Sequence, residues 1–369
     1  MTLDPVDPPT AGVRRRARRV LILQGVALAL LVGVILVGIS PAPYVVERPG
    51  PAYDTLGTTS VDGEVVPVIE VEGAATYPTR GRLDLLTVYL DGSREHPLDW
   101  FSVLAGWVNP DRDVWPVDAI FPAGQTQEES DEQSAAAMQG SQQTAVAAAL
   151  TELGTEFGAV VEVVDVPEAT PASGVLEPGD ELVAVDGRPI RSDGELRAAI
   201  TARGVGESLE LTVRRAGVER SERVVPVARS ATDASPMIGV LVTVRYDFPF
   251  DVTINLPDVG GPSAGMMFGL GIYDAITPGA LTGGEHIAGT GTIDADGVVG
   301  PIGGIAQKMV GARDAGAEWF LAPSENCDEV RGRVPAGLRV FAVSSFDQAV
   351  DVVTTIGRGD PTDGFPGCG

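Results

Sequence analysis

The sequence predicts an α+β protein with one N-terminal transmembrane helix. Residues 20–39 are apolar apart from Gln24. Farther along the chain, short runs rich in Val, Ile and Leu alternate with Gly and Pro turns, which is typical of β-strands. Between these runs lie longer stretches, such as residues 127–153, whose acidic start and following Gly154 are typical of helices. Together these three features indicate a membrane anchor followed by a mixed globular part.

The apolar run is long enough to cross the hydrocarbon of a bilayer as one helix. It follows residues 14–19, which include five arginines. A cleaved signal peptide shares both features. However, the run is longer than a signal core, and prolines at 41 and 43 stand where a cleavage site needs small residues. We therefore expect a single-pass cell-membrane protein, with the lipid bilayer as a partner through residues 20–39. The positive-inside rule keeps the tail 1–19 cytoplasmic and exports residues 41–369.

The net charge excludes one class of partner. At 369 residues the chain can form two or three domains, and its formal charge is −25. Such a surface repels phosphate backbones, so nucleic acid is not expected as a partner. With only two histidines and two cysteines, the chain offers no pattern for a zinc site, and we expect no metal.

Both cysteines, Cys327 and Cys368, lie in the part expected to be exported, where disulfides are favoured. A bridge between them would attach the Gly- and Pro-rich C-terminal tail to the fold. The alternative is a pair of free thiols, and the sequence leaves both readings open.

One lysine and one serine stand out. Lys308 is the only lysine in the chain, and the other 25 of the 26 basic residues are arginines. Arginine keeps its charge at any accessible pH, whereas a desolvated lysine can lose its proton and become a base. Ser263 lies 45 residues earlier, between glycines, in Gly261-Pro262-Ser263-Ala264-Gly265.

This pair suggests nucleophilic catalysis. A serine hydroxyl attacks poorly until a neighbouring group removes its proton. At a predicted helix start, backbone groups of Gly260, Gly261 and Ala264 would hold a developing oxyanion or the substrate backbone. The ordinary lysine pKa of about 10.4 must be lowered by burial before Lys308 can act as a base near neutral pH. The apolar residues that surround Lys308 in the sequence suit such burial.

Residues 156–229 resemble a PDZ domain of the bacterial type. The matching segments are Pro171-Ala172-Ser173-Gly174, Leu176 to Leu182, and Val185 to Ile190. The resemblance implies a β-barrel-like unit in which a peptide ligand adds as a strand beside a helix. A loop of backbone N–H groups would hold the end of that peptide, and we expect this loop at Glu156, Phe157, Gly158 and Ala159.

The remaining exported part resembles the proteolytic domain of Lon endopeptidases. The Ser263 segment is followed by a predicted hairpin, by Gly300-Pro301-Ile302-Gly303-Gly304 and Lys308, and by Pro323-Ser324-Glu325-Asn326. Residues 44–155 resemble the first part of the same α/β domain, and residues 237–357 resemble its catalytic core. The PDZ unit would then be an insertion, and residues 358–369 would form a flexible tail. This order resembles the membrane-anchored PDZ–Lon proteases of Gram-positive, including actinobacterial, species.

By this resemblance, Ser263 is the nucleophile and Lys308 the general base of a Ser–Lys dyad. One departure concerns the position three residues before the serine, where family members often carry an acidic residue. Here it is Gly260, with Asp258 two residues farther back. An ATP-binding G-x-x-x-x-G-K-[ST] loop is excluded because the one lysine is followed by Met309. We therefore expect no cofactor. Lon domains often assemble as rings, so a homo-oligomer stays open.

The resulting hypothesis is an ATP-independent serine endopeptidase that cleaves exported or unfolded polypeptides, with recognition or regulation by the PDZ unit. A second hypothesis is a catalytically inactive PDZ scaffold or anchoring protein. A third is an esterase that uses His286, because GPSAG also fits the G-x-S-x-G elbow of α/β-hydrolases. The third is disfavoured because His286 follows Ser263 by only 23 residues.

Overall fold

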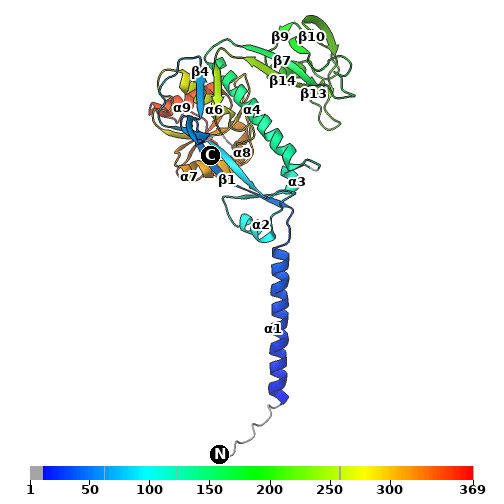
Figure 1. Ribbon diagram of the computed structural model, residues 1–369, viewed down its shortest axis with the longest axis vertical. Coiled ribbons are helices and arrows are strands. Elements are labelled where there is room, and N and C mark those ends of the chain that lie inside the picture. Colours follow the sequence, from blue (N-terminus) through cyan, green and yellow to red (C-terminus); the bar gives the residue numbers. More distant parts are fainter. Residues whose placement is uncertain (1–10, 62, 123, 257–258, 369) are drawn as a thin grey trace, which may run out of the picture. The chain divides into compact units, whose positions relative to one another are not determined.

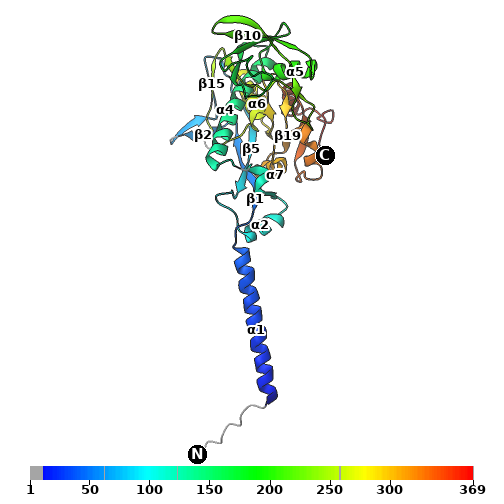
Figure 2. The same ribbon diagram turned by 90° about the vertical axis from the view of Figure 1, so that its right-hand side faces the viewer.

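A computed structural model describes residues 11–61, 63–122, 124–256 and 259–368 (Figures 1 and 2). The chain divides into two compact units. The first comprises Met1–Arg48 and Tyr89–Gln127, and the second comprises Pro49–Val88 and Glu128–Gly369. The strands β1 (Tyr44–Asp54) and β5 (Arg82–Asp91) each contribute residues to both units.

The first unit begins with α1 (Ala11–Gly38), whose apolar side chains from Leu21 to Val37 are largely exposed. Among the described helices, α1 is the one long and apolar enough to cross a membrane, a property that a signal sequence shares. After α1, the start of β1 pairs antiparallel with β6 (Asp113–Pro116). The unit also contains the helices α2 (Trp100–Trp107) and α3 (Val117–Ile120).

The second unit contains a sheet in the order β20 (Arg339–Val343), β19 (Trp319–Pro323), β16 (His286–Gly289), β5 and β1. The pairs β20–β19, β19–β16 and β16–β5 are parallel. Both faces of this sheet are covered by helices, as parallel strands require. Alternate strand residues enter two separate cores. One core packs against α4 (Gln127–Glu152), α6 (Gly265–Ile276) and α9 (Phe346–Gly357), and the other against α7 (Ile305–Ala315) and α8 (Cys327–Val330).

This arrangement explains where a site can form. The helices α6 and α7 lie against opposite faces of the sheet, yet both begin at the edge where the parallel strands end. In open α/β sheets, the crevice beyond the carboxyl ends of the strands is where ligands bind. Ser263 precedes α6 and Lys308 lies in the first turn of α7, so the chain brings both residues to this edge.

Shorter elements complete this part. They are β4 (Ile69–Glu72) paired with β15 (Asp251–Ile254), β17 (Thr292–Ile293) paired with β18 (Val299–Gly300), β2 (Thr58–Val61) paired with β3 (Glu64–Pro67), and the 3-10 turn η1 (Ser324–Asn326).

The segment predicted to be a PDZ unit forms its own sheet in the order β11 (Val218–Val224), β10 (Leu209–Arg215), β8 (Glu181–Val185), β7 (Gly158–Asp165) and β14 (Leu241–Asp247), with the two-residue β9 (Arg188–Pro189) on β8. The helix α5 (Asp193–Arg203) packs on it over a separate core, and β12 (Val227–Ala228) pairs with β13 (Pro236–Met237). The boundary drawn at residue 229 is too early. The whole of β14 pairs with β7, so this strand belongs to the PDZ sheet and not to the catalytic core.

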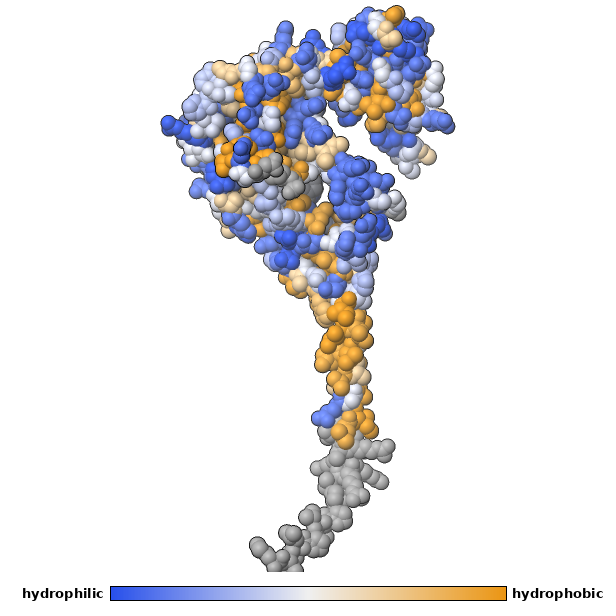
Figure 3. Space-filling view, viewed as in Figure 1, coloured by the Kyte–Doolittle hydropathy of each residue, from blue (hydrophilic) through white to orange (hydrophobic). Residues whose placement is uncertain are grey.

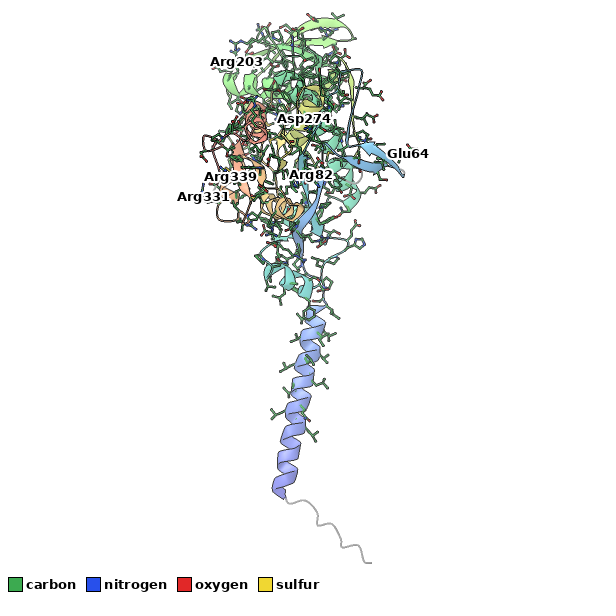
Figure 4. The ribbon with its side chains drawn as sticks, turned by 90° about the vertical axis from the view of Figure 1, so that its left-hand side faces the viewer. Glu64, Arg82, Arg203, Asp274, Arg331 and Arg339 are labelled. Carbon is green, nitrogen blue, oxygen red and sulfur yellow. A yellow bond between two sulfur atoms is a disulfide. The ribbon has the colours of Figure 1, made fainter. Side chains whose placement is uncertain are left out.

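The C-terminal tail is docked rather than flexible. The backbone N–H of Ala342 in β20 donates to the carbonyl of Pro366 at 2.9 Å, and the Phe365 ring lies edge-on to Phe341. Cys368 is buried and forms a disulfide with Cys327. Beside the tail, the guanidinium of Arg339, which is labelled in Figure 4, lies over the Trp319 ring at 5.2 Å. The tail therefore closes one edge of the sheet next to β20.

Candidate active site

Ser263 and Lys308 meet in the folded chain. The Lys308 Nζ donates a hydrogen bond to the Ser263 Oγ at 2.7 Å. Lys308 is only 2% exposed, whereas Ser263 remains partly accessible. A buried amine beside an accessible hydroxyl is the geometry needed for proton transfer in nucleophilic catalysis, for which a separation of about 2.6–3.2 Å is required.

The helix α4 packs against the loop that carries Ser263 and hydrogen-bonds to it. The Ser141 Oγ donates to the carbonyl of Pro262 at 3.0 Å, and the N–H of Gly261 donates to the carbonyl of Ser134 at 2.9 Å. Gly265 permits this close approach, because a Cβ at that position would lie 2.7 Å from the Ser141 Oγ. The second glycine of the GPSAG motif is therefore a packing requirement as well as a turn signal.

The residues at the start of α7 and in the loop before it fix the position of Lys308. Gly304 caps this helix with φ of +69°, a left-handed conformation that favours glycine. The loop before it is fixed by Asn326, whose Oδ1 accepts from the N–H of Ile302 at 2.9 Å and whose Nδ2 donates to the carbonyl of the same residue at 2.9 Å. Asn326 lies next to the disulfide residue Cys327. The Pro-Ser-Glu-Asn segment therefore anchors the lysine helix.

Thr290 is a third member of the site that the sequence did not single out. Its Oγ1 accepts from the Lys308 Nζ at 2.9 Å and donates to the carbonyl of Ser263 at 2.9 Å. Thr290 directly follows β16 and is fully buried. Its hydroxyl thus connects the lysine to the serine loop. The predicted family position for an orienting carboxylate is Gly260 here, and Asp258 lies outside the described residues.

Some of the backbone N–H groups predicted to hold an oxyanion are already hydrogen-bonded within the protein, and others are not. The Gly261 N–H is already engaged by Ser134, so it is not available to a substrate in this conformation. Gly260 is exposed, and a Cβ there would lie 3.0 Å from the Ser134 Cβ, so a side chain would crowd α4. Ala264 is the residue before α6, where the N–H groups of a helix start point outward. The N–H groups at Ser263 and Ala264 are therefore the candidate donors.

His286 is distant from Ser263 and Lys308. It begins β16, four residues before Thr290, which corresponds to about 13 Å of extended chain. Its Nε2 lies 2.7 Å from the Oδ2 of the fully buried Asp84, which also pairs with Arg82. This geometry argues against the esterase hypothesis. Across the described residues, no group of three or more His, Cys, Asp or Glu side chains is arranged to hold a metal.

The hairpin between β17 and β18 contacts the PDZ helix. The Ser192 Oγ, at the start of α5, donates to the Asp296 Oδ2 at 2.7 Å. Burial raises the pKa of Asp294 in the same hairpin, and the nearby carboxylates of Asp296 and Asp193 raise it further. This hairpin begins two residues after Thr290. One short segment therefore joins the PDZ helix to Thr290, which contacts Lys308.

The structure has two cavities in the PDZ segment, one at the loop predicted to hold a peptide end and one beside α5. Gly158 and Ala159 pair with Asp247 and Tyr246 at the far end of β14, and Phe157 packs on Tyr246 and Phe248. The predicted loop residues Glu156, Phe157 and Gly158 border a separate cavity of about 350 Å³ together with Arg191, two residues before α5. A groove of about 500 Å³ lies between α5 and the segment 235–242. Because β14 is the edge strand of the sheet, it is the strand to which a peptide would add.

Two family models match the chain. A PDZ domain model matches residues 126–225, and the model of the Lon protease (S16) C-terminal proteolytic domain matches residues 248–355. The chain therefore carries a PDZ domain and a Lon C-terminal proteolytic domain, and the latter supports a serine peptidase.

Similar proteins cover only parts of the chain. Lon protease 2 of Bacillus subtilis is 28% identical over 43% of this chain and 30% of its own length. Lon protease of Campylobacter concisus is 33% identical over 29% of this chain and 13% of its own length. The chain thus spans less than a third of these relatives. Among solved structures, the PDZ domain of an SdrC-like protein from Listeria innocua is 26% identical, with 22% of this chain and 92% of that chain covered and a TM-score of 0.21.

Proposed function

We propose that this chain is a membrane-anchored serine endopeptidase that cleaves exported or unfolded polypeptides with a Ser263–Lys308 dyad and without ATP. The observation that carries the proposal is the 2.7 Å contact between the Ser263 Oγ and the buried Lys308 Nζ. This contact lies inside the segment that matches a Lon-type proteolytic domain. ATP independence is supported by the sequence, because its single lysine cannot belong to a P-loop.

In the proposed mechanism, neutral Lys308 accepts the hydroxyl proton as the Ser263 Oγ attacks the scissile carbonyl. The carbonyl oxygen becomes an oxyanion, which the N–H groups at the start of α6 stabilise. Protonated Lys308 then delivers its proton to the leaving amine and an acyl-enzyme remains. A water molecule then attacks the acyl-enzyme while Lys308 accepts its proton. Lys308 returns this proton to the Ser263 Oγ as the ester bond breaks, and the second product leaves. Thr290 keeps the lysine aligned by accepting one of its hydrogen bonds.

The proposal is tested with the full chain in detergent and an unfolded test protein such as casein, without nucleotide and with a metal chelator. Wild type is expected to cleave, and Ser263→Ala is expected to lose cleavage. Ser221→Ala, which removes an exposed hydroxyl in β11, is the matched control and should keep it. Cleavage that persists in Ser263→Ala would exclude Ser263 as the nucleophile.

The second candidate function is a PDZ scaffold without peptidase activity. It is favoured by the α5 groove, which can bind a peptide whether or not the dyad works. A wild-type chain that binds peptide but leaves casein and short peptides uncleaved across pH 6–10 would support this candidate over the peptidase.

Substrate recognition is assigned to the groove between α5 and β14. A peptide end would lie near residues 237–240, and the preceding residues would run along β14 toward the α5 start and the Asp296 hairpin. Thr201→Trp fills this groove, whereas Ala198→Trp on the same helix lies outside its lining and is the control. A fluorescent decapeptide with an apolar C-terminus should bind about tenfold more weakly to Thr201→Trp. Equal binding to both variants would place recognition elsewhere.

The exposed apolar helix α1 is assigned as an uncleaved anchor, with the arginine-rich end in the cytoplasm. A cysteine-free chain with one cysteine added at Ser221 should be labelled by a membrane-impermeant maleimide on intact cells. Labelling only after lysis would reverse the assigned topology.

A further inference from the structure

The short helix α2 exposes one apolar face. The segment Trp100–Trp107 contains no charged residue. Phe101, Leu104 and Trp107 are 46%, 54% and 54% exposed, and the following Val108 is 75% exposed. We call these four residues the α2 foot. Their spacing of three to four residues places them on one side of the helix. The other side is buried, because Val103 is fully covered and Gly106 lies against Val46 and Val114.

The helix α2 is fixed at the point where α1 ends. The N–H of Ala42, four residues after α1, donates to the carbonyl of Leu98 at 2.8 Å. The Phe101 ring packs so closely on Gly38 that a Cβ there would lie 2.0 Å from the ring. In addition, Tyr44 makes edge contacts with both Trp100 and Trp107, at 5.8 and 5.6 Å between ring centroids. The position of α2 beside the end of α1 is therefore set by backbone and ring contacts.

An apolar groove separates the two helices. It has a volume of about 560 Å³ and is lined by ten residues, none of them charged: Ala29, Leu30, Gly33, Val34, Val37, Gly38, Trp100, Phe101, Leu104 and Trp107. It extends along α1 from Gly38 back to Ala29, which corresponds to about 13 Å of helix. In the space-filling view, hydrophobic residues cover the visible face of this part of α1 (Figure 3).

We propose that the α2 foot lies in the outer interface of the bilayer and that an acyl chain of an outer-leaflet phospholipid fills the groove. This inference rests on the proposed role of α1 as a membrane span. If Gly38 is near the outer boundary of the hydrocarbon, the groove extends through much of the outer leaflet. Only lipid tails are apolar and long enough to fill it there. Trp residues prefer this interface because the ring is apolar and the indole N–H is polar.

The α2 foot would also restrict how the exported part tilts and rotates relative to the membrane. A single helix allows the exported part to tilt and rotate about its exit, whereas a second contact two turns long limits that motion. The α2 foot is thus assigned as a membrane-docking surface for the first unit. The chemical class of the partner is a zwitterionic or anionic phospholipid, recognised through its tails and not through its charge.

The test uses tryptophan fluorescence of the full chain in vesicles of phosphatidylcholine and phosphatidylglycerol. One variant keeps only Trp107, and a second keeps only Trp319 in β19, with phenylalanine at the other three tryptophan positions. Phosphatidylcholine brominated on its acyl chains is the quencher. We expect Trp107 to be quenched about threefold more than Trp319. Adding Leu104→Glu to the Trp107 variant should remove this difference, whereas adding Val218→Glu in β11 should not.

The outcomes separate the foot from the anchor. If Trp107 is no more quenched than Trp319 while the chain resists extraction by alkaline carbonate, the foot is refuted and the anchor stands. If carbonate extracts the chain, the anchor is refuted and the foot with it. Equal quenching in the Leu104→Glu and parent variants would also refute the foot, because insertion of Leu104 would then not matter.

Discussion

Replacing Lys308 by arginine is expected to abolish peptide cleavage at neutral pH, with a loss of about 10³-fold or more. Arginine preserves the positive charge but cannot give up its proton at accessible pH, so it cannot act as a base. Its guanidinium is also larger than the lysine amine, which hydrogen-bonds to both Ser263 and Thr290. The measurement is cleavage of an unfolded protein by the full chain, with circular dichroism to verify that the variant is folded.

A pH profile distinguishes loss of the base from loss of packing. Burial favours the neutral form of the Lys308 amine. Wild-type activity should therefore rise with pH, and the midpoint of this rise should lie below about 10.4, the ordinary pKa of a lysine side chain. Thr290→Val removes a hydrogen bond to the lysine while keeping its size. It should lower activity and move the midpoint, and Thr290→Ser should restore both. A Lys308→Arg variant with wild-type activity, or a midpoint unchanged in Thr290→Val, would contradict this role.

Removing the disulfide should cause the largest loss of stability. Cys327 and Cys368 are 41 residues apart, and closing a loop of that length contributes about 4 kcal/mol in the chain-entropy model. The double variant Cys327→Ser/Cys368→Ser is therefore expected to unfold roughly 10 °C below wild type. Differential scanning calorimetry of the full chain in detergent measures this shift.

The same variant tests whether the bridge supports the site. Cys327 follows Asn326, which fixes the loop before the lysine helix. Peptidase activity should therefore decline on heating before the rest of the fold unfolds. Ser221→Ala, an exposed substitution in β11 away from the tail, is the control and should not change how activity declines on heating. A double variant with an unchanged melting temperature would show that the docked contacts of Phe365 and Pro366 hold the tail without the bridge.

Local signals in the chain predicted much of the fold. An uninterrupted apolar run indicated α1, and the β-rich and helical segments indicated a mixed architecture that the structure contains. The PDZ and Lon resemblances depended on glycines and prolines at fixed spacings, and both matching family models agree with them. Such signals are readable because each depends on residues close together in the chain, where turn chemistry and periodicity operate.

Strand pairing was harder to predict. β14 was assigned to the catalytic core with the rest of residues 237–357, but it pairs along its full length with β7. The cavity beside α5 is lined by the segment 235–242, which the sequence did not single out, and not by the predicted loop 156–159. The tail was expected to be flexible because of its composition, yet β20 and the disulfide hold it. Pairing between strands about 80 residues apart leaves no local pattern in either strand.

The sequence by itself determined which residues can do chemistry. A single lysine among arginines and a serine between glycines were identified as a pair because their chemical types are complementary. Only the tertiary structure decided that their side chains meet at 2.7 Å, that Thr290 joins them, and that His286 pairs with Asp84 instead. The reason is geometric. Helices on opposite faces of a parallel sheet approach each other only where its strands end, and that edge exists only once the strands have paired.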